Sequence, residues 1–208
     1  MGKIVVFGAG GRAGRQAVAE ARRRGHQVTA VVRDPSRYGG LTDGGVRITA
    51  GDVTDVADVA ALAAGHDAAI NAAAGTDSDA FFTDAAHALV DGLRQAGVDR
   101  LVAVGLSALL PVPDGTRMLD TPAFPAEFRP FCLAHAAGLE VLRAEGGALD
   151  WVYVSPAGDF DHEGERTGHY GIREHGDAAD RISYADFALT LLDEAETPRH
   201  HRRHLAVT

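Results

Sequence analysis

The stretch KIVVFGAGGRAG, residues 3–14, is an apolar run that ends in a burst of glycines. Its glycine part fits a G-x-x-G-x-x-G spacing at Gly8, Gly11 and Gly14, and a G-x-G-x-x-A spacing at Gly8, Gly10 and Ala13. Between a strand and a helix, either spacing allows a tight turn and a close approach of the backbone to a pyrophosphate at the helix N-terminus. The stretch therefore predicts a dinucleotide-binding turn over residues 8–14.

Short β-branched runs alternate with alanine-rich stretches along the whole chain. Continuous apolar runs are typical of strands with both faces covered, and an apolar residue at every fourth position is typical of a helix packed on a sheet. We expect strands at 4–7, 28–32, 46–50, 68–72, 101–104 and 151–154, and helices at 12–24, 56–63, 79–95 and 135–144. The pattern predicts one α/β domain over residues 1–208, a Rossmann-like doubly wound parallel sheet with helices on both faces.

Two segments interrupt this alternation. Residues 109–130 carry five prolines and little periodicity, and residues 158–180 are polar, with five glycines and no apolar face. Each follows a predicted strand, and ligands of open α/β folds bind at the carboxyl ends of the strands. Because loops of this length are usually either functional or disordered, we interpret both segments as the substrate side of a pocket.

The composition is that of an ordinary globular protein with a net charge of −9. This charge argues against a nucleic-acid partner, and we interpret the basic stretch PRHHRRH, residues 198–204, as a solvated surface feature. The single cysteine, Cys132, excludes an intrachain disulfide and fits a reducing compartment. Because the first apolar run is too short for a signal peptide and none reaches membrane-spanning length, we expect a cytoplasmic protein without a membrane partner.

The residues after the second predicted strand, VVRDP, bear on the choice between NAD and NADP. An acidic residue at this position binds the ribose 2′-hydroxyl of NAD, whereas arginine suits the 2′-phosphate of NADP. Arg33 therefore predicts NADP, with Arg12 of the glycine turn as a second positive charge. Asp34, just before Pro35, fits the N-cap of a short helix.

The ends of the third and fourth predicted strands complete the expected cofactor site. In GDVTD, Asp52 and Val53 stand where an adenine ring would rest. In INAAAG, the small residues Ala72, Ala73 and Ala74 stand under the rest of the cofactor. Asn71, which precedes them, fits equally well a structural role that ties neighbouring backbones together.

The chain resembles the atypical short-chain dehydrogenase/reductases with an NAD(P)-binding, NmrA-like domain, and most closely the NADH–flavin reductase and biliverdin reductase B-like group. The resemblance is carried by GAGGRAG, VVRDP, GDVTD, VAVGLSALL, LDWVYVSPAGDF, GERTGHY and RISYADFALTLLDEAETPRH, in that order over nearly the whole chain. It implies a nicotinamide cofactor, NADPH in view of Arg33.

The Tyr-x-x-x-Lys pair of typical short-chain dehydrogenases is missing, because the only lysine is Lys3. Where the pair would be expected the chain reads Phe131-x-x-x-His135, which excludes ketone reduction by a tyrosine. The remaining chemistry is hydride transfer to a flavin or conjugated ring, which needs stacking, orientation and at most one proton donor.

The resemblance implies two catalytic candidates. Ser107 aligns with a hydrogen-bond donor near the nicotinamide, although it also fits the cap of the following turn. His135 aligns with a histidine of the biliverdin reductase-like proteins and is a candidate to donate or relay a proton near neutral pH, although it also fits a solvent-facing helix start. The three histidines of the second long segment, 162, 169 and 175, lack a metal-ligand spacing, so we expect no metal site.

The sequence thus predicts an NADPH-dependent reductase of a flavin, quinone or related conjugated ring, acting on a small aromatic substrate as a monomer or homodimer. Two alternatives stay open. One is a non-catalytic NADP-sensing regulator, which would tolerate the missing Tyr/Lys pair. The other is a reductase or isomerase that tailors a polycyclic natural product; the near absence of lysine among many alanines, glycines and arginines, typical of GC-rich genomes, is compatible with that setting.

Overall fold

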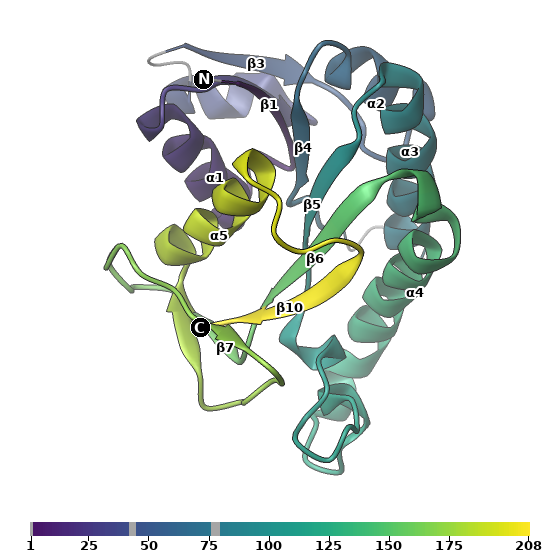
Figure 1. Ribbon diagram of the computed structural model, residues 1–208, viewed down its shortest axis with the longest axis vertical. Helices are drawn as coiled ribbons and strands as arrows, with labels where there is room; N and C mark the ends of the chain where they lie inside the picture. Colours follow the sequence, from purple (N-terminus) through teal and green to yellow (C-terminus); the bar gives the residue numbers. More distant parts are fainter. Residues whose placement is uncertain (1, 42–44, 76–79) are drawn as a thin grey trace.

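Figure 1 shows a sheet with helices on both faces, drawn from a computed structural model that describes residues 2–41, 45–75 and 80–208. The strands are β1 Lys3–Phe7, β2 Gln27–Val32, β3 Val46–Ala50, β4 Ala68–Asn71, β5 Arg100–Val104, β6 Asp150–Pro156, β7 Asp159–Asp161, β8 Ile172–Arg173, β9 Arg181–Ser183 and β10 Arg203–Val207. The helices are α1 Arg12–Arg23, α2 Val56–Ala63, α3 Phe81–Ala96, α4 Arg129–Glu145 and α5 Tyr184–Glu196.

The main sheet has eight strands in the order β3-β2-β1-β4-β5-β6-β10-β8. Neighbours are parallel except at the edge, where β8 runs antiparallel to β10. Strand order reverses between β1 and β4, and such a reversal opens a crevice at the carboxyl ends of the two strands. The predicted doubly wound α/β fold is confirmed, and its switch point lies next to the glycine turn.

Two hydrophobic clusters cover the two faces of the sheet. Helices α2, α3 and α4 pack in sequence on one face, and α1 packs beside α5 on the other (Figure 1). The first cluster includes Leu89 and Leu93 of α3, and the second includes Phe187 and Leu191 of α5, all fully buried. Because both faces are covered, the central strands are continuously apolar, as the sequence pattern predicted.

The six predicted strands are present with small shifts at their ends, but four further strands, β7 to β10, were missed. Residues 198–204 do not form only a solvated surface, because Arg203 and His204 begin β10, which pairs with β6. His204 packs its ring edge-on against Tyr153, with centroids 5.2 Å apart, and its Nε2 lies 2.7 Å from the Ser155 hydroxyl. This strand was not predicted because it begins with basic residues and only three apolar residues, 205–207, follow them.

Helix α4 begins earlier than the predicted range 135–144. It starts at Arg129, with Pro130 in its first turn, where a missing N–H costs nothing. The segment before it is built from short 3₁₀ turns, Met118–Asp120 and Ala126–Phe128 among them. The proline that made this stretch look like loop therefore marks the start of the helix.

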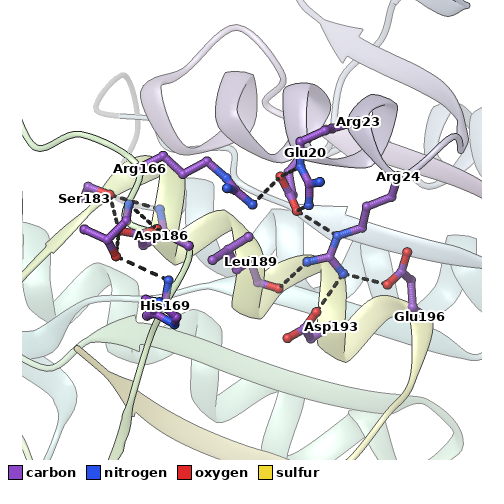
Figure 2. A network of polar contacts seen from close by, with 12 residues as sticks. Glu20, Arg23, Arg24, Arg166, His169, Ser183, Asp186, Leu189, Asp193 and Glu196 are labelled. Atoms are coloured by element: carbon purple, nitrogen blue, oxygen red, sulfur yellow. Dashed lines mark hydrogen bonds and ion pairs between the residues drawn. The ribbon is translucent and has the colours of Figure 1, made fainter.

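The second long segment is tied to the start of α5. The carboxylate of Asp186, which Figure 2 labels beside Ser183, accepts hydrogen bonds from the Thr167 and Gly168 backbones and the Thr167 hydroxyl. The distances are 3.0 Å to the Thr167 N–H, 2.8 Å to the Gly168 N–H and 2.8 Å to the Thr167 hydroxyl. Burial opposes ionisation of Asp186, but these hydrogen bonds outweigh it and lower the pKa of the carboxyl. The Ser183 hydroxyl accepts from the Asp186 N–H and so caps the N-terminus of α5.

No helix in the described parts of the chain combines the length and the apolar character that crossing a membrane requires.

Candidate cofactor and active site

A cavity of about 550 Å³ opens at the carboxyl ends of the first five strands. Its lining follows the chain in order: the glycine turn after β1, residues 32–34 after β2, residues 51–53 after β3, residues 72–74 after β4 and residues 104–106 after β5. The first three segments lie on one side of the switch point and the last two on the other. An elongated ligand that spans the crevice would contact all five strand ends.

The glycine turn can hold a ligand because three of its residues have no room for a Cβ. Gly8 has φ +74°, and a Cβ there would lie 2.4 Å from the backbone nitrogen of Ala73. A Cβ on Gly10 would lie 2.4 Å from the Tyr38 ring, and one on Gly14 would lie 2.2 Å from the Gly8 carbonyl oxygen. Gly8, Gly10 and Gly11 line the cavity with Arg12 and Ala13, whereas Gly14 brings α1 close to β1.

The N-terminus of α1 faces this turn. Gly11 is its N-cap, and the first N–H groups of a helix, with the positive end of the dipole, are suited to a phosphate. No acidic residue occupies the first turn of α1. Arg12 lines the cavity and donates from Nη1 to Nδ1 of His162, 2.6 Å away. The turn therefore fits the pyrophosphate of a dinucleotide, because its backbone carries no side chains in the way and the helix N-terminus and Arg12 supply positive charge.

Basic side chains also line the cavity beyond β2. Arg33 is joined there by Arg37, from the 3₁₀ turn Pro35–Leu41, and by the Tyr38 ring. The Asp34 carboxylate accepts from the Ser36 N–H (3.1 Å) and hydroxyl (2.6 Å), and these hydrogen bonds lower its pKa. The capping role predicted for Asp34 is confirmed, and two arginines stand where an adenosine ribose would end.

Asp52, Val53 and Ala72–Ala74 all line the cavity, as the sequence predicted for the adenine and central parts of a cofactor. Asp52 is held in place: its Oδ1 accepts from the Thr54 N–H (2.9 Å) and hydroxyl (2.7 Å). The Asn71 side chain accepts from the Ala73 N–H at 3.1 Å, which supports its structural role.

The part of the lining that comes from α3, from α4 and from the segment after β5, here called the inner end, is apolar and aromatic. Phe81, Phe131 and Leu106 line it together with His135. The His135 ring lies 4.0 Å from the Phe82 ring, and its Nδ1 is hydrogen-bonded to the Tyr153 phenol. Burial lowers the pKa of His135 to about 4. A buried imidazole carries no charge at neutral pH, and the role of His135 in donating or relaying a proton stays a prediction. The alternative, a solvent-facing helix start, is wrong, because His135 is 6% exposed and lies within α4.

Ser107 does not lie in the cavity wall, although its neighbour Leu106 does. Ser107 begins the 3₁₀ turn Ser107–Leu109, and its carbonyl oxygen accepts from the Leu110 N–H at 2.9 Å. The N-cap of this turn is Leu106 rather than Ser107, so the capping interpretation is wrong. Its assignment as a donor beside the nicotinamide stays a prediction.

Two further residues of the cavity lining were not predicted from the sequence. Phe160 of β7 and Tyr184 of α5 both line the cavity, and their rings stack with centroids 4.0 Å apart at 12°. The helix cap at Ser183 was the available signal, because it places the next residue at the edge of the sheet. Of the two long segments expected to form the substrate side, 158–180 contributes Phe160 to the lining. No residue of 109–130 lines this cavity, although Leu106 and Phe131, which flank that segment, do.

Comparison with known proteins agrees with this geometry. The chain is 35% identical to protein YwnB of Bacillus subtilis, over 99% of this chain and 97% of that one. It is 36% identical to a crystal structure from Burkholderia pseudomallei named "putative exported protein" (TM-score 0.88, all of both chains). It is 33% identical to the Streptococcus pneumoniae structure named "putative NADH-flavin reductase" (TM-score 0.83, 100% and 99% of the chains). Residues 8–198 match the model of the NAD(P)H-binding family, which bears out the expected NAD(P)-binding oxidoreductase, and the chain belongs to that family.

Proposed function

We propose that the protein is an NADPH-dependent reductase that transfers a hydride to a flavin, quinone or related conjugated ring. The observation that carries this proposal is the inner end of the cavity, where aromatic side chains and an uncharged histidine stand in place of a Tyr–Lys pair. With Lys3 as the only lysine, the chain has no Tyr-x-x-x-Lys pair for ketone reduction. The name of the S. pneumoniae relative supports a flavin as the acceptor.

The residues of the cavity would hold NADPH in an extended form. The glycine turn and the α1 N-terminus would bind the pyrophosphate, Asp52 and Val53 would border the adenine, and Ala72–Ala74 would lie under the nicotinamide half. Arg33 and Arg37 would pair with the 2′-phosphate, since guanidinium groups match phosphate geometry. The bound cofactor supplies the hydride, so the protein needs to bind, orient and exclude water.

The cofactor preference can be tested by charge reversal at Arg33. Arg33→Asp is expected to weaken NADPH binding by about tenfold or more and NADH binding much less, because only NADPH carries the 2′-phosphate. Arg47→Asp is the matched control, since Arg47 is exposed on β3 and is not among the cavity residues. Equal weakening of both cofactors by Arg33→Asp contradicts the NADPH preference.

The aromatic end of the cavity would place an acceptor ring against the nicotinamide. Flat side chains such as Phe81 and Phe131 favour flat ligands and keep water from the hydride path. His135 would offer a hydrogen bond there as a neutral imidazole. These groups suit an acceptor that delocalises the charge it receives.

Turnover decides between this function and its rivals. We expect multiple-turnover oxidation of NADPH with flavin mononucleotide or a naphthoquinone, and slower turnover when Phe131→Ala opens the inner end of the cavity. Leu133→Ala is the matched control, because Leu133 lies exposed on the same helix. Tight NADPH binding without oxidation by any flavin or quinone would favour a sensing protein, and turnover only with polycyclic substrates would favour a tailoring enzyme.

A further inference from the structure

The Tyr153 phenol is fixed against His135 by its surroundings. Tyr153 lies in β6 and is 4% exposed, and its hydroxyl is hydrogen-bonded to Nδ1 of His135. Its ring packs edge-on against His204, and a Cβ on Gly105 would lie 2.1 Å from its Cε1. The glycine therefore leaves the space that the phenol ring fills, and the ring has no room to turn away from His135.

His135 is held as firmly on its own side. Its ring lies 4.0 Å from the Phe82 ring and 5.8 Å from the Phe131 ring, the second at an interplanar angle of 71°. The side chain is 6% exposed and lines the cavity. Its Nε2 makes no hydrogen bond to any residue in the described ranges, and it is not among their fully buried unpartnered atoms. Nε2 is thus the ring nitrogen open to a ligand.

The direction of the hydrogen bond follows from the partners that the phenol has. Within the described residues, Tyr153 makes this hydrogen bond alone. If Nδ1–H donated to the phenol oxygen, the buried O–H would be left without an acceptor, which is costly. Burial raises the pKa of Tyr153 and lowers that of His135 to about 4, so both groups are uncharged at pH 7. The phenol therefore donates to Nδ1, and the imidazole proton sits on Nε2.

We propose that Tyr153 is a positioning residue that holds His135 as the Nε2–H tautomer and so presents a hydrogen-bond donor to the cavity beside Phe131 and Leu106. The role in catalysis rests on the proposed function, because it requires an acceptor ring in this place. The Nε2–H would donate to the ring heteroatom on which negative charge gathers as the hydride arrives. A ligand without an acceptor at that position would leave the donor unpaired and bind less well.

The tautomer can be measured without any turnover. Long-range ¹H–¹⁵N spectra of protein labelled at histidine report which ring nitrogen carries the proton, and His135→Gln assigns the signals. We expect Nε2–H alone in the wild type and a mixture of both tautomers in Tyr153→Phe. Tyr170→Phe is the matched control, because the Tyr170 hydroxyl donates to Asp193 at 2.8 Å. An Nδ1–H signal in the wild type, or an unchanged tautomer in Tyr153→Phe, overturns the proposal.

Kinetics test whether the tautomer serves the reaction. With NADPH and flavin mononucleotide, we expect Tyr153→Phe to lower kcat about three- to tenfold, the range that one net hydrogen bond explains, with the KM for NADPH unchanged. In a His135→Phe background the same change should have no further effect on kcat. A shifted tautomer with unchanged kcat would refute the catalytic role and leave the proposed reductase intact. Absence of turnover in the wild type would refute the reductase, and the tautomer assignment would stand.

Discussion

Replacing Glu20 with glutamine tests how helix α1 is held to α5. Glu20 is buried in α1, and its carboxylate accepts from Arg23 (2.6 and 2.7 Å) and from Arg24 Nε (2.8 Å), as Figure 2 shows. Arg24 continues to Asp193 of α5, 2.7 Å away, so the network joins α1 to α5. The charge on Glu20 is thus part of the contact between the two helices.

The contribution of Glu20 to the free energy of unfolding can be worked out from its pKa. Hydrogen bonds from Arg23, opposed by burial and helped by Arg24, lower it from 4.5 to about 2. Since a tenfold change in an equilibrium is about 1.4 kcal/mol, the ionised carboxylate contributes about 3 kcal/mol of stability at neutral pH. A lowered pKa gives stability that is complete above the unfolded value and is lost as the pH falls toward the folded one. At pH 3 the contribution should have fallen to about 1.4 kcal/mol.

Urea unfolding at pH 7 and pH 3 measures this effect. Glu20→Gln should lose about 2–3 kcal/mol at pH 7, and its difference from the wild type should shrink by about half or more at pH 3. Asp91→Asn is the matched control, because Asp91 also pairs with an arginine three residues on, but both side chains are exposed, at 47% and 62%. It should cost less than about 1 kcal/mol. A pH-independent difference for Glu20→Gln, or equal losses in both variants, would refute the reasoning.

Three further predictions concern the turn, the core and a helix cap. Gly14→Ala would place a Cβ 2.2 Å from a backbone oxygen of the turn and should weaken NADPH binding at least about tenfold in a fluorescence titration, while Gly147→Ala, with open space around it, should not. Unchanged affinity in Gly14→Ala would contradict the close approach of α1 and β1. Arg100→Met leaves the buried Glu194 carboxylate without its 2.8 Å partner and should cost about 3–5 kcal/mol in chemical unfolding, a loss below about 1 kcal/mol being contrary evidence. Asp55→Ala removes the cap that accepts from the third N–H of α2 and should cost about 1 kcal/mol, which Asp55→Asn should largely restore; equal losses would argue against the cap.

Much of this fold can be predicted from patterns of residues that lie close together in the sequence. The strand before Gly8 and the helix after it follow from an apolar run, a glycine that adopts φ +74° and alanine spacing. The helix cap at Ser183 follows from a serine three residues before an aspartate. Such features depend on neighbours in the sequence, which is why the ends of the first five strands, and the residues there that line the cavity, could be placed in advance.

The features that could not be predicted depend on contacts between segments that are distant in the sequence. Strand β10 is short and follows basic residues, and only its pairing with β6 shows that it is a strand. The low pKa of His135 comes from burial among side chains of α3, α4 and β6, which its own surroundings in the sequence do not reveal. The same holds for Phe160 and Tyr184, whose stacking at the cavity mouth joins β7 to α5.

We propose that this cavity holds NADPH and that the bound cofactor passes its hydride to a conjugated ring. Stopped-flow absorbance of the NADPH-bound protein mixed with flavin mononucleotide tests it most directly, with ordinary NADPH compared with NADPH deuterated at the transferred position. We expect the bound NADPH signal to decay on mixing, and to decay several-fold more slowly for the deuterated cofactor because the hydride moves in the observed step. Bound NADPH that persists in the presence of flavin and quinone acceptors would contradict the claim.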